Sequence, residues 1–170
     1  MQDVTNSHND LADEITLRNL MAQYCDAVTR NDSSRWIDCW SQDAQWNLLG
    51  NTVCGKEAIL TLFQQMMTGF EFALMIPGIC QFEVNGDSAT GYWYLQEFTR
   101  DSNGNGSSLF SRYEDSYIKQ EGNWKYQRRS YQILYSGEAL FTGAFPPAKA
   151  LDQSPNNADD VDATPENANL

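Results

Sequence analysis

Residues 71 to 135 consist of four β-rich runs separated by turn segments. Asn85-Gly86 separates the first two runs and is typical of a hairpin turn, because glycine readily adopts a positive φ. The second run covers 90–99, a longer loop follows at 101–108, and the third run covers 111–118. A turn at 120–123 then leads into the last run at 124–135. This pattern predicts an antiparallel meander of four long strands.

Helical patterns precede the strands. Residues 10–31 carry apolar side chains at helical spacing, and Asp10 can cap the start of that helix. Serines at 33 and 34 predict a second, short helix containing Trp36, Ile37 and Trp40, a brief strand is expected at 43–49, and a third helix near 55–68. Helices followed by a meander predict an α+β fold, in which three N-terminal helices and a strongly curved, mostly antiparallel sheet enclose a pocket.

A chain of 170 residues with 41% hydrophobic side chains favours one globular domain. The interpretation divides the chain into a flexible N-terminal segment at 1–9, a folded domain at 10–150 and an acidic, disordered tail at 151–170. The tail is predicted because large apolar residues become rare after Pro146-Pro147.

The net charge of −12 argues against binding to nucleic acid or to an anionic membrane. The first residues lack the basic and apolar regions of a signal peptide, and no run is long enough to span a membrane, so a cytoplasmic protein is expected. Four scattered cysteines and one histidine favour neither a disulfide framework nor a metal site. Nucleotide-binding and hydrolase motifs are absent from the sequence, which predicts action without a cofactor.

Several segments together resemble one family: Tyr24, WSQDAQW at 40–46, GKEAI at 55–59, FEVNGDSATGYWYL at 82–95 and SRYEDSYIKQEGNWKYQRR at 111–129. The chain resembles the SnoaL-like group of the nuclear transport factor 2-like superfamily, which includes scytalone dehydratase, bile acid 7α-dehydratase and hexachlorocyclohexane dehydrochlorinase. The resemblance extends over residues 10 to 147. It implies a cone-shaped α+β barrel around a pocket.

In those enzymes a histidine on the first long strand, usually paired with an aspartate from the first helix, removes a proton and drives an elimination. Here the histidine position is occupied by Met75 and the aspartate position by Thr29. Met75 cannot exchange a proton and is interpreted as apolar wall or core. His8 is expected to be solvated in a polar segment, and Asp32 is a secondary candidate for the missing acid.

The resemblance implies roles for other residues. Tyr24 matches a tyrosine of the bile acid enzyme and is either a hydrogen-bond donor or a core residue; Arg129 matches an arginine that stabilises the leaving group, or else is a solvated sheet residue. Trp93 and Ser111 match positions that face substrate in scytalone dehydratase. The remaining ligand-binding candidates are Val28, Thr29, Leu48, Met75, Leu95 and Tyr131.

Period-two alternation places Trp93, Leu95 and Glu97 on one face of their strand, and Ser111, Tyr113 and Asp115 on one face of the next. Glu97 and Asp115 are therefore the carboxyl groups expected to point at the pocket, where burial would raise a carboxyl pKa, unless they lie in water at the rim. The predicted catalytic set is Tyr24, Glu97, Tyr113, Asp115 and Arg129.

Two functions fit this sequence. The first is a cofactor-independent lyase, isomerase or cyclase that acts on a hydrophobic cyclic molecule such as a polyketide, steroid or terpenoid. The second is a non-catalytic protein that binds a small ligand or mediates assembly; support of a larger oxygenase is a third possibility. Under either main reading a homo-oligomer, a dimer or a trimer, is expected, with Tyr126, Tyr131 and Tyr135 suited to a sheet-to-sheet interface.

Overall fold

The computed structural model describes residues 2–140, 142 and 143, with side chains from residue 11 onward. Three helices occur among these residues: α1 (Gln2–Arg30), α2 (Ser33–Ile37) and α3 (Lys56–Met67). A short hairpin of β1 (Trp40–Leu48) and β2 (Asn51–Cys54) lies between α2 and α3 in the chain. Four long strands follow: β3 (Phe70–Asn85), β4 (Ser88–Asp101), β5 (Gly106–Gln120) and β6 (Asn123–Glu138).

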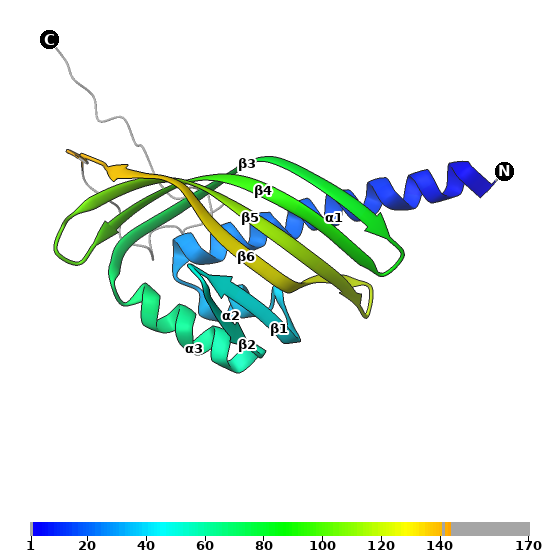
Figure 1. Ribbon diagram of the computed structural model, residues 1–170, viewed down its shortest axis with the longest axis horizontal. Coiled ribbons are helices and arrows are strands. Elements are labelled where there is room, and N and C mark those ends of the chain that lie inside the picture. Colours follow the sequence, from blue (N-terminus) through cyan, green and yellow to red (C-terminus); the bar gives the residue numbers. More distant parts are fainter. Residues whose placement is uncertain (1, 141, 144–170) are drawn as a thin grey trace, which may run out of the picture.

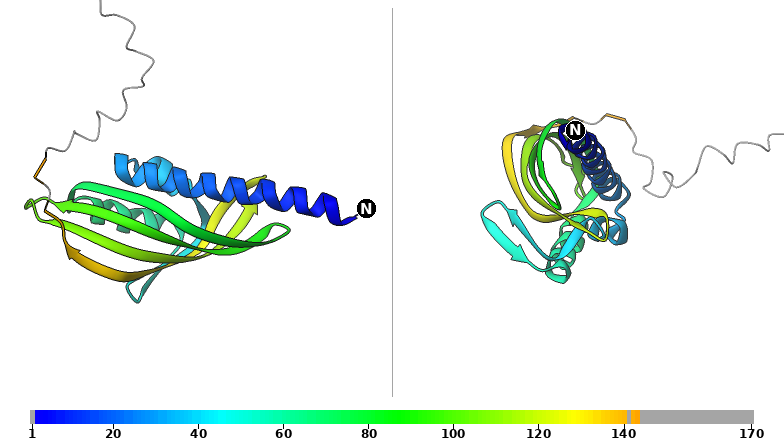
Figure 2. Two further views of the ribbon diagram at one scale, coloured as in Figure 1. Left: turned by 90° about the horizontal axis from the view of Figure 1, so that it is seen from above. Right: turned by 90° about the vertical axis from the view of Figure 1, so that its right-hand side faces the viewer.

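The six strands form one sheet in the order β2-β1-β6-β5-β4-β3, in which every pairing is antiparallel except that of β1 with β6. The sheet is strongly curved, and α1 lies along its concave side (Figures 1 and 2). The α+β fold with a curved, mostly antiparallel sheet and N-terminal helices is therefore confirmed.

Tight turns hold the meander in register. Gly86 and Asp87 connect β3 to β4, and Gly86 has a φ of 60°, which glycine adopts without steric penalty. Glu121 and Gly122 connect β5 to β6, both with positive φ. Positive φ at both central residues is typical of the type I′ turns that fit the twist of a hairpin.

The hydrophobic core fills the space between the concave face and the helices. The predicted apolar face of α1 is buried: Leu17, Leu20, Met21, Tyr24 and Val28 are each at most 7% exposed. Aromatic rings attach the short elements to this core, since the Trp36 ring of α2 stacks on the Phe63 ring of α3 at 4.0 Å between centroids and an interplanar angle of 12°. Trp40 and Trp46 of β1 both lie against Trp36.

Some boundaries differ from the sequence prediction. Trp40 begins β1 instead of ending α2, because α2 ends at Ile37 and Tyr126 of β6 donates its backbone N–H to the Cys39 carbonyl next to it. The strand β2 was not predicted. Helix α1 begins at Gln2, so His8 lies within it, in the part where the backbone alone is described.

The predicted tail at 151–170 lies outside the described residues, and the division of the chain at residues 10 and 150 stays a prediction. Within the described residues, none of the helices combines the length and the apolar character needed to cross a membrane.

Candidate functional site

A cavity of about 240 Å³ lies between α1, α3 and the concave face of the sheet. Its walls are mostly apolar: Val28 from α1, Leu48 from β1 and Met75 from β3 line it, as do further side chains from α3 and β3 that sequence reasoning missed. The latter include Phe63, Met66, Met67, Phe70 and Leu74. Phe63, Met66 and Met67 are spaced at i, i+3 and i+4, so the periodicity of that helix was a signal for one shared face.

Four polar side chains of the predicted set line this cavity: Tyr24, Glu97, Tyr113 and Tyr131. They come from α1, β4, β5 and β6, so four elements far apart in sequence converge here. The hydroxyl oxygens of Tyr24 and Tyr113 lie 3.5 Å apart. Burial raises the pKa of both phenols, which keeps them neutral and able to donate hydrogen bonds.

Glu97 is held in place by two hydroxyl donors. Tyr131 donates to its Oε1 at 2.8 Å, and Ser111 donates to the same oxygen. Burial raises the pKa of the Glu97 carboxyl, while the hydrogen bonds from Ser111 and Tyr131 and the charge of Arg129 oppose that shift. Glu97 is therefore a carboxyl group whose proton affinity is increased, a property of groups that act in acid–base chemistry.

Met75 and Glu97 are direct cross-strand partners in the β3–β4 ladder, and both line the cavity. Side chains at such paired positions have Cβ atoms roughly 4.5–5.5 Å apart. The carboxyl group thus lies one strand away from the position at which the resemblance leads one to expect a histidine.

Asp115 and Arg129 face the core rather than the cavity. They are cross-strand partners of β5 and β6, and the guanidinium group donates from Nε to Oδ1 and from Nη2 to Oδ2, each at 2.8 Å. Tyr117 also donates to Asp115 at 2.8 Å. Neither side chain is among the described residues that line the cavity. The two side chains form a buried ion pair in which each charge neutralises the other.

The guanidinium group of Arg129 is enclosed by aromatic rings. Its central carbon lies 3.8 Å from the ring centroid of Tyr126, 3.9 Å from that of Tyr113 and 4.4 Å from that of Tyr24. Cations are attracted to the faces of such rings, most strongly when desolvated. Arg129 therefore lies behind the two tyrosines that line the cavity and supports their rings.

The other predicted positions do not line the cavity. Ser111 is buried and bonds Glu97, Trp93 packs edge-on against Phe82, and Leu95 is buried in the core. Thr29 is partly buried on α1, and Asp32 caps α2 by accepting from the backbone N–H of Arg35. Neither Thr29 nor Asp32 is among the residues that line the inner cavity.

No group of three or more histidine, cysteine, aspartate or glutamate side chains within the described residues could hold a metal ion. The four cysteines are free, and burial raises the pKa of the Cys25 and Cys39 thiols to about 12, which keeps both protonated. Such thiols are poor nucleophiles.

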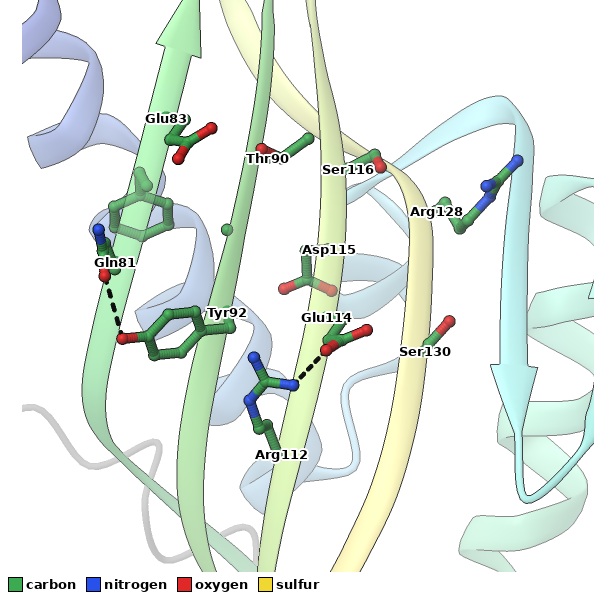
Figure 3. Close-up of a pocket in the computed structure, with 12 residues that line it drawn as sticks. Gln81, Glu83, Thr90, Tyr92, Arg112, Glu114, Asp115, Ser116, Arg128 and Ser130 are labelled. Carbon is green, nitrogen blue, oxygen red and sulfur yellow. Dashed lines mark hydrogen bonds and ion pairs between the residues drawn. The ribbon is translucent and has the colours of Figure 1, made fainter.

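A wider groove of about 520 Å³ lies on the opposite, outer face of the sheet (Figure 3). Tyr92 donates to Gln81 at 3.2 Å there, and Arg112 donates to Glu114. Glu114 and Arg128 are exposed to solvent. Because water surrounds these charges, a ligand bound in the groove would stay largely in contact with solvent, and the inner cavity is the stronger candidate.

The structure is similar to hexachlorocyclohexane dehydrochlorinase LinA-type3 from Novosphingobium barchaimii, with 19% identity, a TM-score of 0.74 and coverage of 83% of this chain and 99% of that one. A scytalone dehydratase-like protein from Novosphingobium aromaticivorans is similar with 16% identity, a TM-score of 0.74 and coverage of 82% and 96%.

An NTF2-like protein with a cystatin-like fold, also from Novosphingobium aromaticivorans, is similar with 21% identity, a TM-score of 0.66 and coverage of 79% and 90%. At these identities the likeness shows the fold. No curated protein matches the sequence. A family description, the SnoaL-like domain, matches residues 9–130, which is most of the chain, and the chain belongs to that family.

Proposed function

We propose that this protein is a cofactor-independent enzyme of the lyase, isomerase or cyclase type that acts on a small hydrophobic cyclic molecule bound in the inner cavity. The observation that carries the proposal is the Glu97 carboxyl group, which lies in an apolar cavity and is fixed by Ser111 and Tyr131. A carboxyl group in such a place is poised to take up and return a proton.

The cavity limits the size of the substrate. Its volume of about 240 Å³ equals about eight water molecules at roughly 30 Å³ each, and it lies below the roughly 300–1,000 Å³ typical of pockets for drug-sized ligands. A polyketide or terpenoid fragment of one or two rings is therefore favoured over a four-ring steroid. Its apolar part would contact Met66, Met67 and Met75, whose flexible side chains adapt to ligand shape.

The phenols of Tyr24 and Tyr113 would donate hydrogen bonds to a substrate oxygen, with Glu97 as acid or base. Arg129 takes a positioning role, because Asp115 neutralises its charge and aromatic rings cover it. One of the solved structures that share the fold is a hexachlorocyclohexane dehydrochlorinase. This similarity supports the proposal that a protein of this fold acts on a small molecule. Cofactor independence and a cytoplasmic location stay predictions of the sequence.

The alternative is a protein of the same fold that binds a small ligand without converting it. The observation that favours it is the absence of the histidine–aspartate pair at Met75 and Thr29. Both readings share the cavity, so ligand binding alone does not separate them.

Turnover by matched variants does separate them. Thermal-shift screening of cyclic ketones and phenols, with native mass spectrometry of the complexes, first identifies ligands. For each ligand we expect Glu97→Gln to retain binding and to lose conversion by at least about 100-fold, since general acid–base groups contribute roughly 10²–10⁴-fold. Glu83→Gln, which removes an exposed carboxyl of β3, serves as the control. Binding without conversion by the parent protein would establish the alternative.

We also propose a homo-oligomer, a dimer or a trimer, that forms through the outer face of the sheet. One rung of that face runs from Ile76 on β3 to Phe110 on β5 and Tyr135 on β6, and these three side chains are 45%, 46% and 55% exposed. Tyr126 and Tyr131 were expected on such an interface, but Tyr126 is fully buried and Tyr131 lines the cavity.

A further inference from the structure

The groove on the outer face of the sheet carries polar side chains that the proposed function does not use (Figure 3). We infer that this groove binds a linear, neutral oligosaccharide that lies across the strands. The inference goes beyond the proposed function, because none of the residues that line the groove also lines the inner cavity.

The polar side chains of the groove form two rows that cross the sheet from β3 to β6. The first row consists of the cross-strand partners Glu83, Thr90, Ser116 and Arg128. The second row consists of the cross-strand partners Gln81, Tyr92, Glu114 and Ser130. Neighbouring strands lie about 4.8 Å apart, so each row extends over roughly 14 Å. The groove thus presents polar groups at each of four successive strands (Figure 3).

Most of these side chains have hydrogen-bonding capacity that the protein itself does not use. Within the described part of the chain, five of them form neither a hydrogen bond nor an ion pair with another residue: Glu83, Thr90, Ser116, Arg128 and Ser130. The Gln81 side chain accepts from the Tyr92 hydroxyl at 3.2 Å, which leaves its amide N–H groups free to donate. A ligand that replaces water at these groups therefore has to supply both donors and acceptors.

The charges of the groove favour a neutral ligand. The charged side chains that face outward are two arginines and two glutamates: Arg112, Arg128, Glu83 and Glu114. Asp115 also borders the groove, but its carboxylate is neutralised by Arg129 on the inner side. Because these charges balance and the whole chain carries a net charge of −12, a nucleic acid or another polyanion would be repelled.

The polar lining and the shape of the groove favour a hydroxyl-rich chain over other neutral ligands. An apolar small molecule needs apolar walls, and a peptide needs buried apolar anchors, whereas this groove of about 520 Å³ is lined mostly by polar side chains. A sugar hydroxyl both donates and accepts, as these side chains require. The units of a linear oligosaccharide follow one another at nearly the spacing of neighbouring strands, so four units can contact β3 to β6 in turn.

The groove is separate from the apolar rung through which the oligomer is proposed to form. Ile76, Phe110 and Tyr135 are not among the residues that line the groove. Phe110 precedes Ser116 by six residues on β5, which is about 20 Å along an extended strand. A second copy of the chain seated on the groove itself is the competing occupant, and the experiment has to distinguish it from an oligosaccharide.

NMR titration of the isotope-labelled full chain with cellotetraose, maltotetraose, xylotetraose and mannotetraose tests the inference. We expect at least one of them to shift the amide signals of the groove residues on β3 to β6. The double variant Thr90→Val/Arg128→Ala should bind that sugar at least about 10-fold more weakly, because one neutral and one charged hydrogen bond are lost. Thr52→Val, at an exposed position of β2 outside the groove, is the matched control and should bind like the parent protein.

Three results would overturn the inference. The first is the absence of any shift with all four tetrasaccharides. The second is a sugar whose binding shifts signals elsewhere or is unchanged in the double variant. The third is a parent protein that binds no sugar while the double variant dissociates in sedimentation, which would make the groove an interface between copies. None of these results bears on the turnover experiment with Glu97→Gln, which concerns the inner cavity.

Discussion

Glu97 is a carboxyl group whose proton is held more tightly in the folded protein than in the unfolded chain. Burial raises its pKa above the ordinary value of 4.5, so the folded state carries more protons than the unfolded state as the pH rises past that value. The contribution of Glu97 to the free energy of unfolding is therefore complete below about pH 4.5 and declines as the pH rises through the raised pKa.

Replacing Glu97 by glutamine should remove this dependence. We expect the free energy of unfolding of Glu97→Gln, measured relative to the parent protein by urea denaturation, to increase as the pH is raised from 4.5 towards neutrality. Glu83→Gln, the same change at an exposed carboxyl group of the outer face, serves as the control. A constant difference between parent and Glu97→Gln at all pH values would contradict the assigned shift.

Asp115 and Arg129 are predicted to be tightly coupled in stability. Asp115→Asn leaves a fully buried guanidinium group without its counterion, and breaking a buried pair in this way costs about 3–5 kcal/mol. Glu114→Gln, the neighbouring change on the outer face, should cost less than about 1 kcal/mol, since Glu114 is exposed. Denaturation of the double variant Asp115→Asn/Arg129→Met should show a clearly smaller loss than the sum of the single changes.

Residue-scale roles were predictable from the sequence only in part. Alternation from Trp93 correctly placed Glu97 on the inner face, and it also placed Asp115 on the inner face of β5. It could not reveal that Arg129 is opposite Asp115, because that partnership depends on the register of β5 and β6, which contains a bulge between Ser116 and Tyr117. The ion-pair partner of Asp115 is thus determined by the register of β5 and β6.

At the scale of elements, β3 and β4 approach closely at Gly91. A methyl group at this position would lie 2.6 Å from the backbone oxygen of Gln81 and 2.7 Å from Cδ1 of Phe82. The Phe82 ring packs against Trp93 and Tyr117, so it cannot easily move away from a side chain added at position 91. The glycine allows the Phe82 ring to lie against the β4 backbone.

Gly91→Ala should therefore lower the free energy of unfolding by about 1–3 kcal/mol through overpacking. Gly78→Ala is the matched control on β3, since its added methyl group would meet the nearest atom, the Tyr94 oxygen, at an ordinary 3.4 Å. Urea denaturation of both variants measures the difference. Equal losses would mean that the contact at Gly91 is relieved by movement of the Phe82 ring.

Elements with strong periodicity were predicted well, and their irregular ends were not. The buried face of α1 and the four long strands follow from side-chain spacing and turn residues. The bulge between Phe110 and Ser111 inserts one residue into β6, so Tyr131 faces inward while Tyr135 faces outward. Alternation counted along the sequence alone assigns both tyrosines to one face.

At the scale of the whole molecule, the outer face differs from the rest of an acidic surface. The chain carries a net charge of −12, whereas Arg112 and Arg128 balance Glu83 and Glu114 along this groove (Figure 3). Two copies can therefore approach through this face without the repulsion expected elsewhere. The exposed rung of Ile76, Phe110 and Tyr135 would supply the apolar contact.

Substitution of Phe110 by lysine should weaken this association. We expect the parent protein to sediment as a dimer or trimer of the 19.3 kDa chain and Phe110→Lys to shift towards the monomer, with the cavity and its ligands unaffected. Leu49→Lys, at a more exposed apolar position in the turn between β1 and β2, serves as the control. A parent protein that sediments as a monomer would contradict the proposed oligomer.

The parallel pairing of β1 with β6 joins an early part of the chain to a late one. Trp46 of β1 is paired with Arg129 of β6, so about half of the sequence separates these two neighbours in the sheet. During synthesis, β1, β2 and α3 emerge from the ribosome well before the strand that completes their sheet. We expect the tryptophan side chains of this N-terminal unit to stay exposed to solvent until β6 has been synthesised and pairs with β1. The late pairing of β6 should therefore be the slow step of folding and the one most sensitive to aggregation.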